Sequence, residues 1–423
     1  MGTGLILAAP GSGHGKTTVT LGLLRALHRA GVNMRGAKSG PDYIDPRFHA
    51  AACKKPCFNL DAWAMSQTRI KSLAAGDGLL LIEGAMGLFD GAPPMGKGAT
   101  ADLARILNLP VVLIVDAAKM AQSVAPLVSG FAHHDPSVRI AGIILNNVGS
   151  DRHETMLRRA LDQQSIPVLG AVHRQTGIAH PSRHLGLVQA AERPDLDAYL
   201  NTVADAVEKS VDLGAFQNLA APLNAAPRQT KTPPPAQSIA IAQDAAFAFS
   251  YPHLLQDWRA AGATVLTFSP LGDQAPEPAD LIILPGGYPE LHAAQISAAS
   301  NFRTGMVKAA KTTQIYGECG GYMVLGNAMT DASGTARPML GLLPLATSFA
   351  KPRLHLGYRN LTPLGGPFAG AQKGHEFHYA TTLSAQGPAL FKATDAEGTI
   401  LKEMGLRQGN VTGSFAHIID AAE

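Results

Sequence analysis

Short runs of consecutive apolar residues recur along the first half of the chain. They are "LILAA" (5–9), "LLLIE" (79–83), "VVLIV" (111–115) and "IAGIIL" (140–145). Between them, apolar residues return at helical spacing in "KTTVTLGLLRALHRAG" (16–31) and "DRHETMLRRALDQQ" (151–164). Continuous apolar runs are typical of parallel strands covered on both faces, and their alternation with helices predicts a doubly wound α/β sheet.

Residues 209–237 interrupt this pattern. They lose apolar periodicity, gather prolines and end in Pro233-Pro234-Pro235, which favours an extended surface linker. The alternation then restarts with "SIAIA" (238–242), a helix over 251–261, "TVLTF" (264–268) and "LIILPGG" (281–287). The pattern therefore predicts two doubly wound α/β domains, at 1–208 and 238–423, joined by a linker at 209–237.

Composition narrows the function classes. The 423 residues are 46% hydrophobic, and the formal charge of +3 is too small to argue for binding to nucleic acid or to a membrane, so neither partner is expected. The first apolar run is too short for a signal peptide, and no run approaches the length of a membrane span. Three cysteines, an odd and small number, fit a reducing cytoplasm, where we expect the protein to act. Cys53 and Cys57 have no second pair to complete a metal site and are interpreted as structural.

The first strand leads into "APGSGHGKTTVT" (9–20), a glycine-rich loop followed by a helix. Glycines let successive backbone N–H groups turn toward phosphate oxygens, the lysine reaches the outer phosphates, and the hydroxyl after it can bind Mg²⁺. The strict pattern has glycine where this chain has Pro10, so we interpret the stretch as a variant phosphate loop. The residues expected to bind ATP here are Gly11, Gly13, Gly15, Lys16, Thr17 and Thr18.

Two further stretches fit ATP-dependent chemistry. "LLLIEGAMGLFDG" ends a buried strand at Glu83 and then brings Asp90 in a loop, and carboxylates at such an edge are placed for Mg²⁺. "AKSGPDYIDPRFH" (37–49) gathers polar residues in a turn; these are Lys38, Asp42, Tyr43 and Asp45. Each acidic residue taken singly is more often a solvated turn residue or a helix cap, but together with the phosphate loop they become candidates for holding metal, ATP and an anionic substrate. Asn146 follows another strand and either reads an adenine edge or serves the turn.

In the second half, "TTQIYGECGGYMVLG" (312–326) places Cys319 between the end of a strand and the start of a helix, among glycines. This geometry is that of a nucleophile elbow, in which the side chain stands at a sharp corner and following N–H groups face an oxyanion. The alternative is a small buried cysteine near a helix start.

These motifs occur in one order along nearly the whole chain, together with "KSGPDYIDPRFHAAA", "EGAMGLFDG", "ILNNVGSDRH", "LPGGYPELHA", "LGYR" and "GHEFHY". The series closely resembles the cobyrinate or hydrogenobyrinate a,c-diamide synthase family of cobalamin biosynthesis. In that family the first domain is similar to dethiobiotin synthetase, a P-loop NTPase-like fold, and the second is a class I glutamine amidotransferase.

The resemblance implies which residues of the second domain hydrolyse glutamine. Cys319 is the nucleophile that attacks the side-chain amide of glutamine, and Gly286 and Gly287 of "LPGGYPELH" present N–H groups to the oxyanion. The family's histidine matches His417 in "GSFAHIID". Many class I amidotransferases carry a glutamate two residues later, where this chain has Ile419, so the resemblance implies a Cys–His dyad whose third member is absent or comes from elsewhere. His375 and His378 are competitors for the base, interpreted as pocket-wall or structural residues.

For the first domain, the resemblance implies that ATP and Mg²⁺ convert the a and c acetate side chains of a corrinoid to acyl phosphates, which ammonia from glutamine then displaces. Lys16 and Lys38 would neutralise the transferred phosphoryl group. Thr17, Asp42 and Glu83 are the residues matched to Mg²⁺. Tyr43, Asp45 and Asp90 would line the substrate side, and Asn146 the ATP side. An internal route for ammonia is inferred, since ammonia is protonated in bulk water.

Three other functions remain open at this point. The first is a,c-diamidation of another tetrapyrrole such as nickel-sirohydrochlorin, and the second is cobyric acid synthase, against which the "GPDYIDP" turn and the chain length argue. The third is a nucleotide-binding regulator with an inactive amidotransferase domain, against which Lys16 and Cys319 argue. The sequence does not decide between a cobalt-containing and a metal-free ring, or between a monomer and a homodimer.

Overall fold

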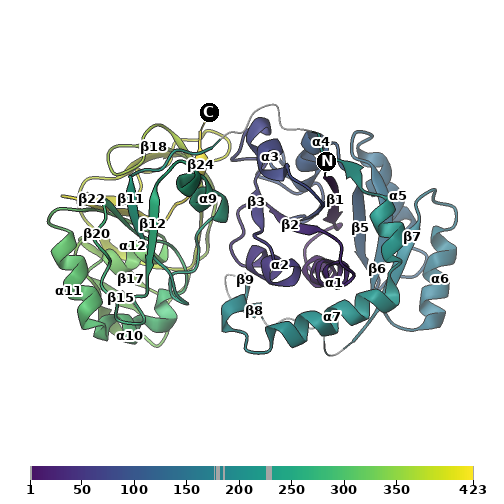
Figure 1. Ribbon diagram of the computed structural model, residues 1–423, viewed down its shortest axis with the longest axis horizontal. Coiled ribbons are helices and arrows are strands. Elements are labelled where there is room, and N and C mark those ends of the chain that lie inside the picture. The colour runs from purple at the N-terminus through teal and green to yellow at the C-terminus, as the bar shows by residue number, and fades with distance from the viewer. Residues whose placement is uncertain (1, 176, 178–181, 184–185, 225–230, 423) are drawn as a thin grey trace. The chain divides into compact units, whose positions relative to one another are not determined.

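The computed structural model describes residues 2–175, 177, 182–183, 186–224 and 231–422. The chain divides into two compact units, Met1–Thr230 and Lys231–Glu423. Each unit has its own central, largely parallel sheet with helices around it (Figure 1). This confirms the predicted fold class of two α/β domains.

Within its described residues, the first unit contains an eight-stranded sheet with the order β3-β2-β4-β1-β5-β6-β7 and β10 beside β1. The seven strands in the row are parallel. Their bounds are β1 Thr3–Ala8, β2 Met34–Ser39, β3 Phe58–Leu60, β4 Leu79–Glu83, β5 Val111–Asp116, β6 Ile140–Val148 and β7 Val168–His173. Buried apolar residues dominate β1, β4 and β5, as expected for central parallel strands.

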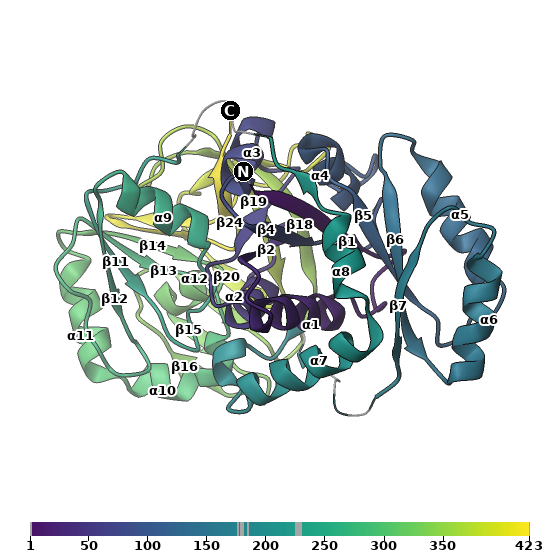
Figure 2. The same cartoon turned by 45° about the vertical axis from the view of Figure 1, so that its right-hand side comes forward.

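The first six helices of this unit connect consecutive parallel strands, and the last two follow β7 along the chain. They are α1 Lys16–Arg29, α2 Asp45–Cys53, α3 Gln67–Ala74, α4 Thr100–Leu107, α5 Val124–His134, α6 Asp151–Leu161, α7 Leu196–Ser210 and α8 Leu213–Asn218, with a short 3₁₀ turn at Ala190–Glu192. Helix α1 packs against α2 and α7, whereas α5 packs against α6 (Figure 2). Two short strands, β8 Ser182–Arg183 and β9 Gly186–Leu187, form a separate ladder.

Residues 209–222, which the sequence analysis assigns to the linker, are structured. They include the end of α7, all of α8 and the strand β10 Ala221–Pro222. β10 pairs antiparallel with the start of β1, through Thr3 and Pro222. The apolar periodicity is weak there because α8 is short, with Phe216 as its buried residue. Residues 225–230 of the predicted linker lie outside the described residues.

Between residues 231 and 422, the second unit has a six-stranded sheet with the order β12-β11-β13-β14-β23-β22. The strands from β12 to β23 are parallel, and β22 runs antiparallel to β23. The bounds are β11 Ser238–Ala242, β12 Thr264–Phe268, β13 Leu281–Leu284, β14 Gln314–Glu318, β22 Leu406–Gln408 and β23 Val411–Ser414. The helices are α9 Pro252–Ala260, α10 Ala293–Ala298, α11 Ser300–Ala309 and α12 Gly320–Leu325, with the 3₁₀ turn η3 Pro289–His292.

Two smaller sheets complete this unit, with the orders β16-β15-β17-β20 and β21-β18-β19-β24. Their strands are β15 Ala328–Thr330, β16 Ala336–Pro338, β17 Leu345–Ser348, β18 His355–Pro363, β19 Gln372–His378, β20 Thr381–Ala385, β21 Phe391–Thr394 and β24 His417–Ala421. The sheet that contains β24 fastens the end of the chain, because β24 pairs antiparallel with β19. The C-terminal segment is therefore an ordered strand, as a catalytic role for His417 requires.

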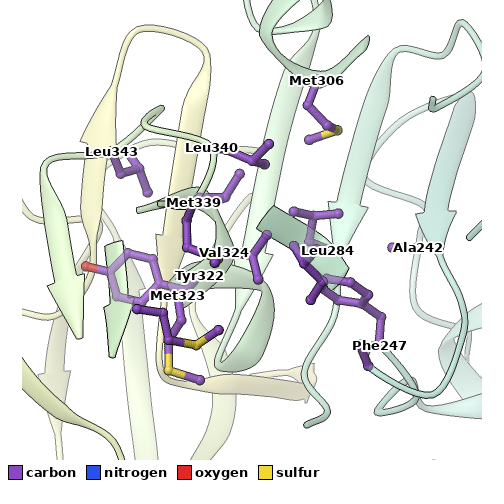
Figure 3. Packing of buried hydrophobic residues seen from close by; sticks show 14 of the residues in the cluster. Ala242, Phe247, Leu284, Met306, Tyr322, Met323, Val324, Met339, Leu340 and Leu343 are labelled. Carbon is purple, nitrogen blue, oxygen red and sulfur yellow. The ribbon is translucent and has the colours of Figure 1, made fainter. Parts of the chain in front are cut away.

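The core of the second unit surrounds α12. Figure 3 shows Val324 of this helix between Leu284 on one side and Met339 on the other. The residues of α12 are all buried, including both of its glycines. Burial on every side holds the helix rigidly against the strand that precedes it.

None of the helices among the described residues combines the length and the apolar character needed to cross a membrane.

Replacement of Gly22 by alanine should destabilise the first unit. A Cβ at Gly22 would lie 2.4 Å from Val207 Cγ2 and 3.0 Å from Val203 O, so α1 and α7 would have to separate. We expect a loss of about 1–3 kcal/mol in the free energy of unfolding, typical of overpacking. Gly130→Ala is the matched control in α5, where a Cβ meets nothing within 4 Å, and should stabilise by about 0.5–1 kcal/mol. Urea unfolding of both variants measures the difference; equal effects would contradict close packing of α1 on α7.

Candidate active sites

In the first unit, β1 turns sharply into α1 through the glycine-rich loop. Gly13 and Gly15 have φ values of 83° and 81°, a region that glycine adopts without steric cost. Asn146, from β6, donates its side-chain N–H to the carbonyl of His14 at 2.9 Å. A Cβ at Gly15 would meet the same Asn146 nitrogen at 2.2 Å. The amide of Asn146 therefore holds the loop in place.

Lys16 stands at the first turn of α1 and folds back over the loop. Its ammonium donates to the carbonyl of Gly11 at 3.2 Å and to that of Met86 at 2.5 Å. Burial, together with the nearby Lys38 ammonium, lowers the pKa of Lys16 to about 8. A cation whose hydrogen bonds go to carbonyl oxygens in this way is available to a phosphate group at the loop.

Beside the loop, a buried cluster joins residues from three elements. The hydroxyl of Thr17 donates to Glu83 Oε1 at 2.7 Å and lies 3.4 Å from Asp45 Oδ2. The ammonium of Lys38 donates to Asp45 Oδ2 at 2.6 Å and to Glu83 Oε1 at 2.9 Å. The cluster forms because β2 and β4 are neighbours whose parallel register pairs Lys38 with Glu83.

The charges in this cluster support one another. Burial opposes the charged form of Lys38, yet the carboxylates of Asp45 and Glu83 raise its pKa above the usual range. Burial likewise opposes ionised Glu83, but Lys38 and His49 hold its pKa well below the ordinary value. His49 Nε2 lies 2.5 Å from Glu83 Oε2, and its Nδ1 lies 3.6 Å from the Cys57 thiol. His49 therefore fixes the second oxygen of the carboxylate.

The remaining predicted residues of this site lie around the cluster. Asp42 caps the first turn of α2 by accepting the N–H groups of Ile44 and Asp45 at 2.7 and 3.1 Å, and burial beside Asp45 raises its pKa to about 6. Asp90 accepts the N–H of Gly87 at 2.9 Å. Tyr43 is buried, and Thr18 bonds the hydroxyl of Tyr199 on α7. Thus Thr17, Lys38, Asp45 and Glu83 meet directly, whereas Thr18 faces away toward α7.

The donor atoms of the cluster suit a hard cation. Hydroxyl and carboxylate oxygens are the ligands that Mg²⁺ prefers, and this ion is usually bound by one or two carboxylates together with substrate phosphates. Among the residues that the structure describes, no group of three or more His, Cys, Asp or Glu side chains could hold a metal ion by itself. Thr17 and Glu83 therefore fit Mg²⁺ that arrives with a nucleotide. Asp45, which the sequence analysis places on the substrate side, also lies beside the Thr17 hydroxyl.

In the second unit, Cys319 occupies the corner between β14 and α12. Its φ of 46° and ψ of −104° form a strained backbone conformation for a residue with a side chain. Its N–H donates to the carbonyl of Ser414 at 2.8 Å, which ties the corner to β23. A strained cysteine between a buried strand and a helix has the geometry of a nucleophile elbow.

Gly286 and Gly287 lie beside this corner. A Cβ at Gly286 would meet the His417 ring at 2.4 Å, and a Cβ at Gly320 would meet the Gly287 nitrogen at 3.2 Å. The loop after β13 therefore touches both the residue after Cys319 and the imidazole of His417. Only glycine leaves room for these approaches, so the structure brings the predicted oxyanion loop, elbow and histidine together.

Cys319 and His417 are both buried and neutral at neutral pH. Burial and the carboxylate of Glu290 raise the pKa of the Cys319 thiol above its ordinary value, although the Gly320 N–H opposes this. Burial, together with His378, lowers the pKa of His417 to about 3. Formation of the thiolate therefore needs a proton acceptor that is oriented and stabilised when the substrate is present.

The two competing histidines have structural contacts. The ring of His375 stacks on that of His417 at 5.0 Å and its Nε2 lies 3.1 Å from the hydroxyl of Tyr251. The ring of His378 lies flat between those of Phe415, at 3.9 Å, and His355, at 4.6 Å. The rings of His375 and His378 therefore lie close to His417, which agrees with their interpretation as pocket-wall residues.

Two residues of these sites were missed by the sequence analysis. His49 looks like an ordinary helix residue, and its contact with Glu83 depends on α2 covering the end of β4. Glu318 directly precedes Cys319, and its Oε2 lies 3.7 Å from His417 Nδ1. An acidic residue at the end of an otherwise apolar buried strand was the available signal for Glu318.

The two units define a class of protein in which a nucleotide-binding domain is joined to a glutamine amidotransferase domain. Residues 5–188 match the family described as CobQ/CobB/MinD/ParA nucleotide binding domain, and residues 238–423 match that described as CobB/CobQ-like glutamine amidotransferase domain. A hydrogenobyrinate a,c-diamide synthase of Brucella anthropi is 53% identical over 99% of this chain and 98% of its own length. One of Rhizobium meliloti is 53% identical over 99% of this chain and 100% of its own. The chain belongs to the hydrogenobyrinate a,c-diamide synthase family.

Among solved structures, one titled as a glutamine amidotransferase is 17% identical and covers 33% of this chain and 71% of its own. Its TM-score of 0.23 is too low to support an argument.

Replacement of Lys38 by methionine should destabilise the first unit in a pH-dependent way. The variant leaves Asp45 and Glu83 buried without their ammonium, which typically costs about 3–5 kcal/mol. Both carboxylates then gain by protonation, so the loss in unfolding free energy should be larger at pH 8 than at pH 5. Lys209→Met, on the exposed side of α7, is the matched control and should unfold like the parent. Urea unfolding at both pH values measures this; a pH-independent deficit would contradict the charge cluster.

Proposed function

We propose that this chain amidates the a and c acetate side chains of hydrogenobyrinate or cobyrinate in cobalamin biosynthesis, using ATP and ammonia cut from glutamine. The observation that supports this most is that each half of the reaction has its own site. A phosphate loop with paired cations lies in the first unit, and a cysteine elbow with an oxyanion loop lies in the second. Relatives with the same two parts, matched over their whole length, carry the name of that enzyme.

In the second unit, we assign glutamine hydrolysis to Cys319 and His417. The thiol gives its proton to the imidazole and its sulfur attacks the side-chain amide of glutamine, forming a tetrahedral oxyanion. The N–H groups around Gly286 and Gly287 would stabilise that oxyanion. Collapse releases ammonia and leaves a thioester, which water hydrolyses to glutamate. The burial of Cys319, 2% exposed, keeps bulk water from the sulfur.

In the first unit, we assign activation of the carboxylate to the phosphate loop. A carboxylate is a poor acceptor for ammonia, because its oxygen is a poor leaving group; an acyl phosphate has a good one. The acetate oxygen attacks the γ-phosphorus of ATP, ADP leaves, and ammonia then displaces phosphate. Lys16 and Lys38 would neutralise the transferred group. Mg²⁺ at Thr17 and Glu83, with Asp45 or Asp42 as the further oxygen donor, would balance the charge of the phosphates.

The remaining assignments concern binding. We assign the substrate side of the first site to Tyr43, Asp45 and Asp90, and contact with ATP to Gly11, Gly13, Gly15, Asn146 and Thr18, the last through its backbone N–H because its side chain bonds Tyr199. For Asn146 the observed bond to the loop makes a positioning role the better reading than contact with adenine. The cysteines of the described residues are free, which fits a cytoplasmic enzyme. A homodimer is an alternative to a monomer that sedimentation of the purified protein distinguishes.

The direct test supplies purified protein with ATP, Mg²⁺, glutamine and either hydrogenobyrinate or cobyrinate. The expected product gains two amide groups, and its mass shows which ring is accepted. Nickel-sirohydrochlorin serves as the competing tetrapyrrole. Amidation of that ring alone would replace the proposed substrate, and absence of any amidation or glutaminase activity would favour a regulator.

Replacement of Cys319 by alanine should affect amidation with glutamine but not amidation with ammonium. Only glutamine hydrolysis needs the thiolate, so glutamine-dependent amidation should disappear while amidation with added ammonium salt continues. Rates with each donor, measured side by side, check this. Loss of both activities to the same extent would assign Cys319 a structural role.

Replacement of Lys16 by alanine should stop amidation with both donors. The variant lacks the cation that lies over the phosphate loop, a loss of about 3 kcal/mol or more in transition-state stabilisation, or about 10²-fold in rate. Glutaminase activity measured without ATP is the internal control, because Cys319 is untouched. A variant that amidates at the parental rate would refute the phosphate-loop assignment.

A further inference from the structure

The structure places a third ionisable residue against the proposed Cys–His pair. Glu318, the last residue of β14, is buried and its Oε2 lies 3.7 Å from His417 Nδ1. We propose that Glu318, the residue directly before the nucleophile, is the positioning residue that orients His417 for glutamine hydrolysis. This inference rests on the proposed function of the second unit.

The carboxylate of Glu318 is itself held in a fixed orientation. Its Oε1 accepts the backbone N–H of Ile418 at 3.1 Å and the hydroxyl of Tyr316 at 3.3 Å. Both donors engage the same oxygen, which leaves Oε2 toward the imidazole. Since Ile418 follows His417 in β24, the bond to its N–H also ties the carboxylate to the histidine's own strand.

The strand arrangement explains how a residue beside the nucleophile reaches the base. β14 and β23 are parallel neighbours, and their register pairs Glu318 with Ser414. The chain leaves β23 at Ser414 and returns through His417, the first residue of β24. Position 419, where many class I amidotransferases carry the orienting glutamate, holds a fully buried isoleucine. Glu318 thus supplies from the nucleophile's strand the carboxylate that is missing there.

Other ionisable side chains also lie around Cys319 and His417. Glu376 on β19 is bound by the guanidinium of Arg359 at 2.7 and 2.6 Å. On the same strand, His375 stacks on the His417 ring, His378 disfavours protonation of His417, and the carboxylate of Glu376 favours it. Glu290 on η3 acts on Cys319 and disfavours the thiolate. Glu318 is the carboxylate that directly approaches the histidine's Nδ1.

This arrangement determines which imidazole nitrogen reacts. If Nδ1–H faces the carboxylate, Nε2 carries the lone pair and accepts the thiol proton of Cys319. The imidazolium that results is stabilised by the carboxylate, which remains ionised. When ammonia leaves, the same proton passes to the leaving nitrogen, so the charge balance is restored in each half-reaction.

The protonation state of the Glu318 carboxylate should make the glutaminase rate depend on pH. Burial raises the pKa of Glu318 to about 7, although the N–H of Ile418 and the hydroxyl of Tyr316 oppose this. The carboxylate is therefore ionised above that pH and protonated below it. Because only the ionised form stabilises the imidazolium, glutaminase kcat/KM should fall as the pH is lowered through about 7.

The test compares Glu318→Gln with the parent in a glutaminase assay across pH 5.5–9. Glutamine is a near-isostere that keeps the side chain's size but lacks the negative charge. We expect kcat to fall about 10²-fold with little change in KM. The decrease in kcat/KM as the pH is lowered through about 7, here called the acid limb, should disappear. Alkylation of Cys319 by iodoacetamide, followed by mass spectrometry of its peptide, should slow in parallel because less thiolate forms.

Tyr316→Phe provides a graded second variant. It removes one of the two donors to Oε1 but leaves the carboxylate, so the pKa of Glu318 should rise and the acid limb should move to higher pH. Asp420→Asn is the matched control: it removes a buried carboxylate from the same strand as His417, where it bonds the Thr232 hydroxyl. Its rate and pH profile should equal those of the parent.

The outcomes separate this inference from the proposed function. A parental rate and acid limb in Glu318→Gln, with Cys319→Ala and His417→Asn inactive toward glutamine, would reject Glu318 and leave the proposed function standing. Equal loss of ammonia-dependent and glutamine-dependent amidation in Glu318→Gln would reject the positioning role in favour of a folding role. Full glutamine use by Cys319→Ala would reject the proposed function itself.

Discussion

The sharp change from a buried parallel strand to a helix is the constraint on which both candidate sites depend. β1 passes into α1 through glycines at positive φ, and β14 passes into α12 through a strained cysteine. At such a corner the first N–H groups of the helix and the last side chains of the strand point to one place. The packing of α1 on α7, and of α12 within its apolar core, keeps these corners from relaxing.

Buried charge characterises the proposed phosphate site of the first unit. Lys38, Asp45 and Glu83 are nearly inaccessible to solvent, and the ammonium of Lys38 bonds both carboxylates. Such a cluster adds little net stability over an apolar core. Removal of one member, however, leaves the remaining charges buried without compensation, which is strongly destabilising. The same oxygens that pair with Lys38 are those that suit Mg²⁺, so the proposed binding of Mg²⁺ with a nucleotide would use the atoms of the internal ion pairs.

In the proposed mechanism, the second unit must make the buried thiol of Cys319 reactive. Burial alone disfavours both the thiolate of Cys319 and the imidazolium of His417. A carboxylate next to the imidazole offsets part of that cost, because it favours the charged form of the histidine. Glu318 lies where this requires, and the bonds from Tyr316 and Ile418 hold it there without a further element of structure.

The sequence by itself determined the class of fold, the strands at 79–83, 238–242 and 264–268, the glycine-rich corner before α1 and the cysteine corner before α12. These depend on local patterns of apolar residues and glycines, which a linear reading detects. Only the tertiary structure decided which side chains meet. Lys38 and Glu83 pair because β2 and β4 are neighbours in a sheet whose order differs from the chain order. Glu318 meets His417, and residues 209–222 fold onto the first unit, through strand pairings between distant segments. Local sequence carries no record of register between such segments, since register is chosen by the packing of the whole sheet.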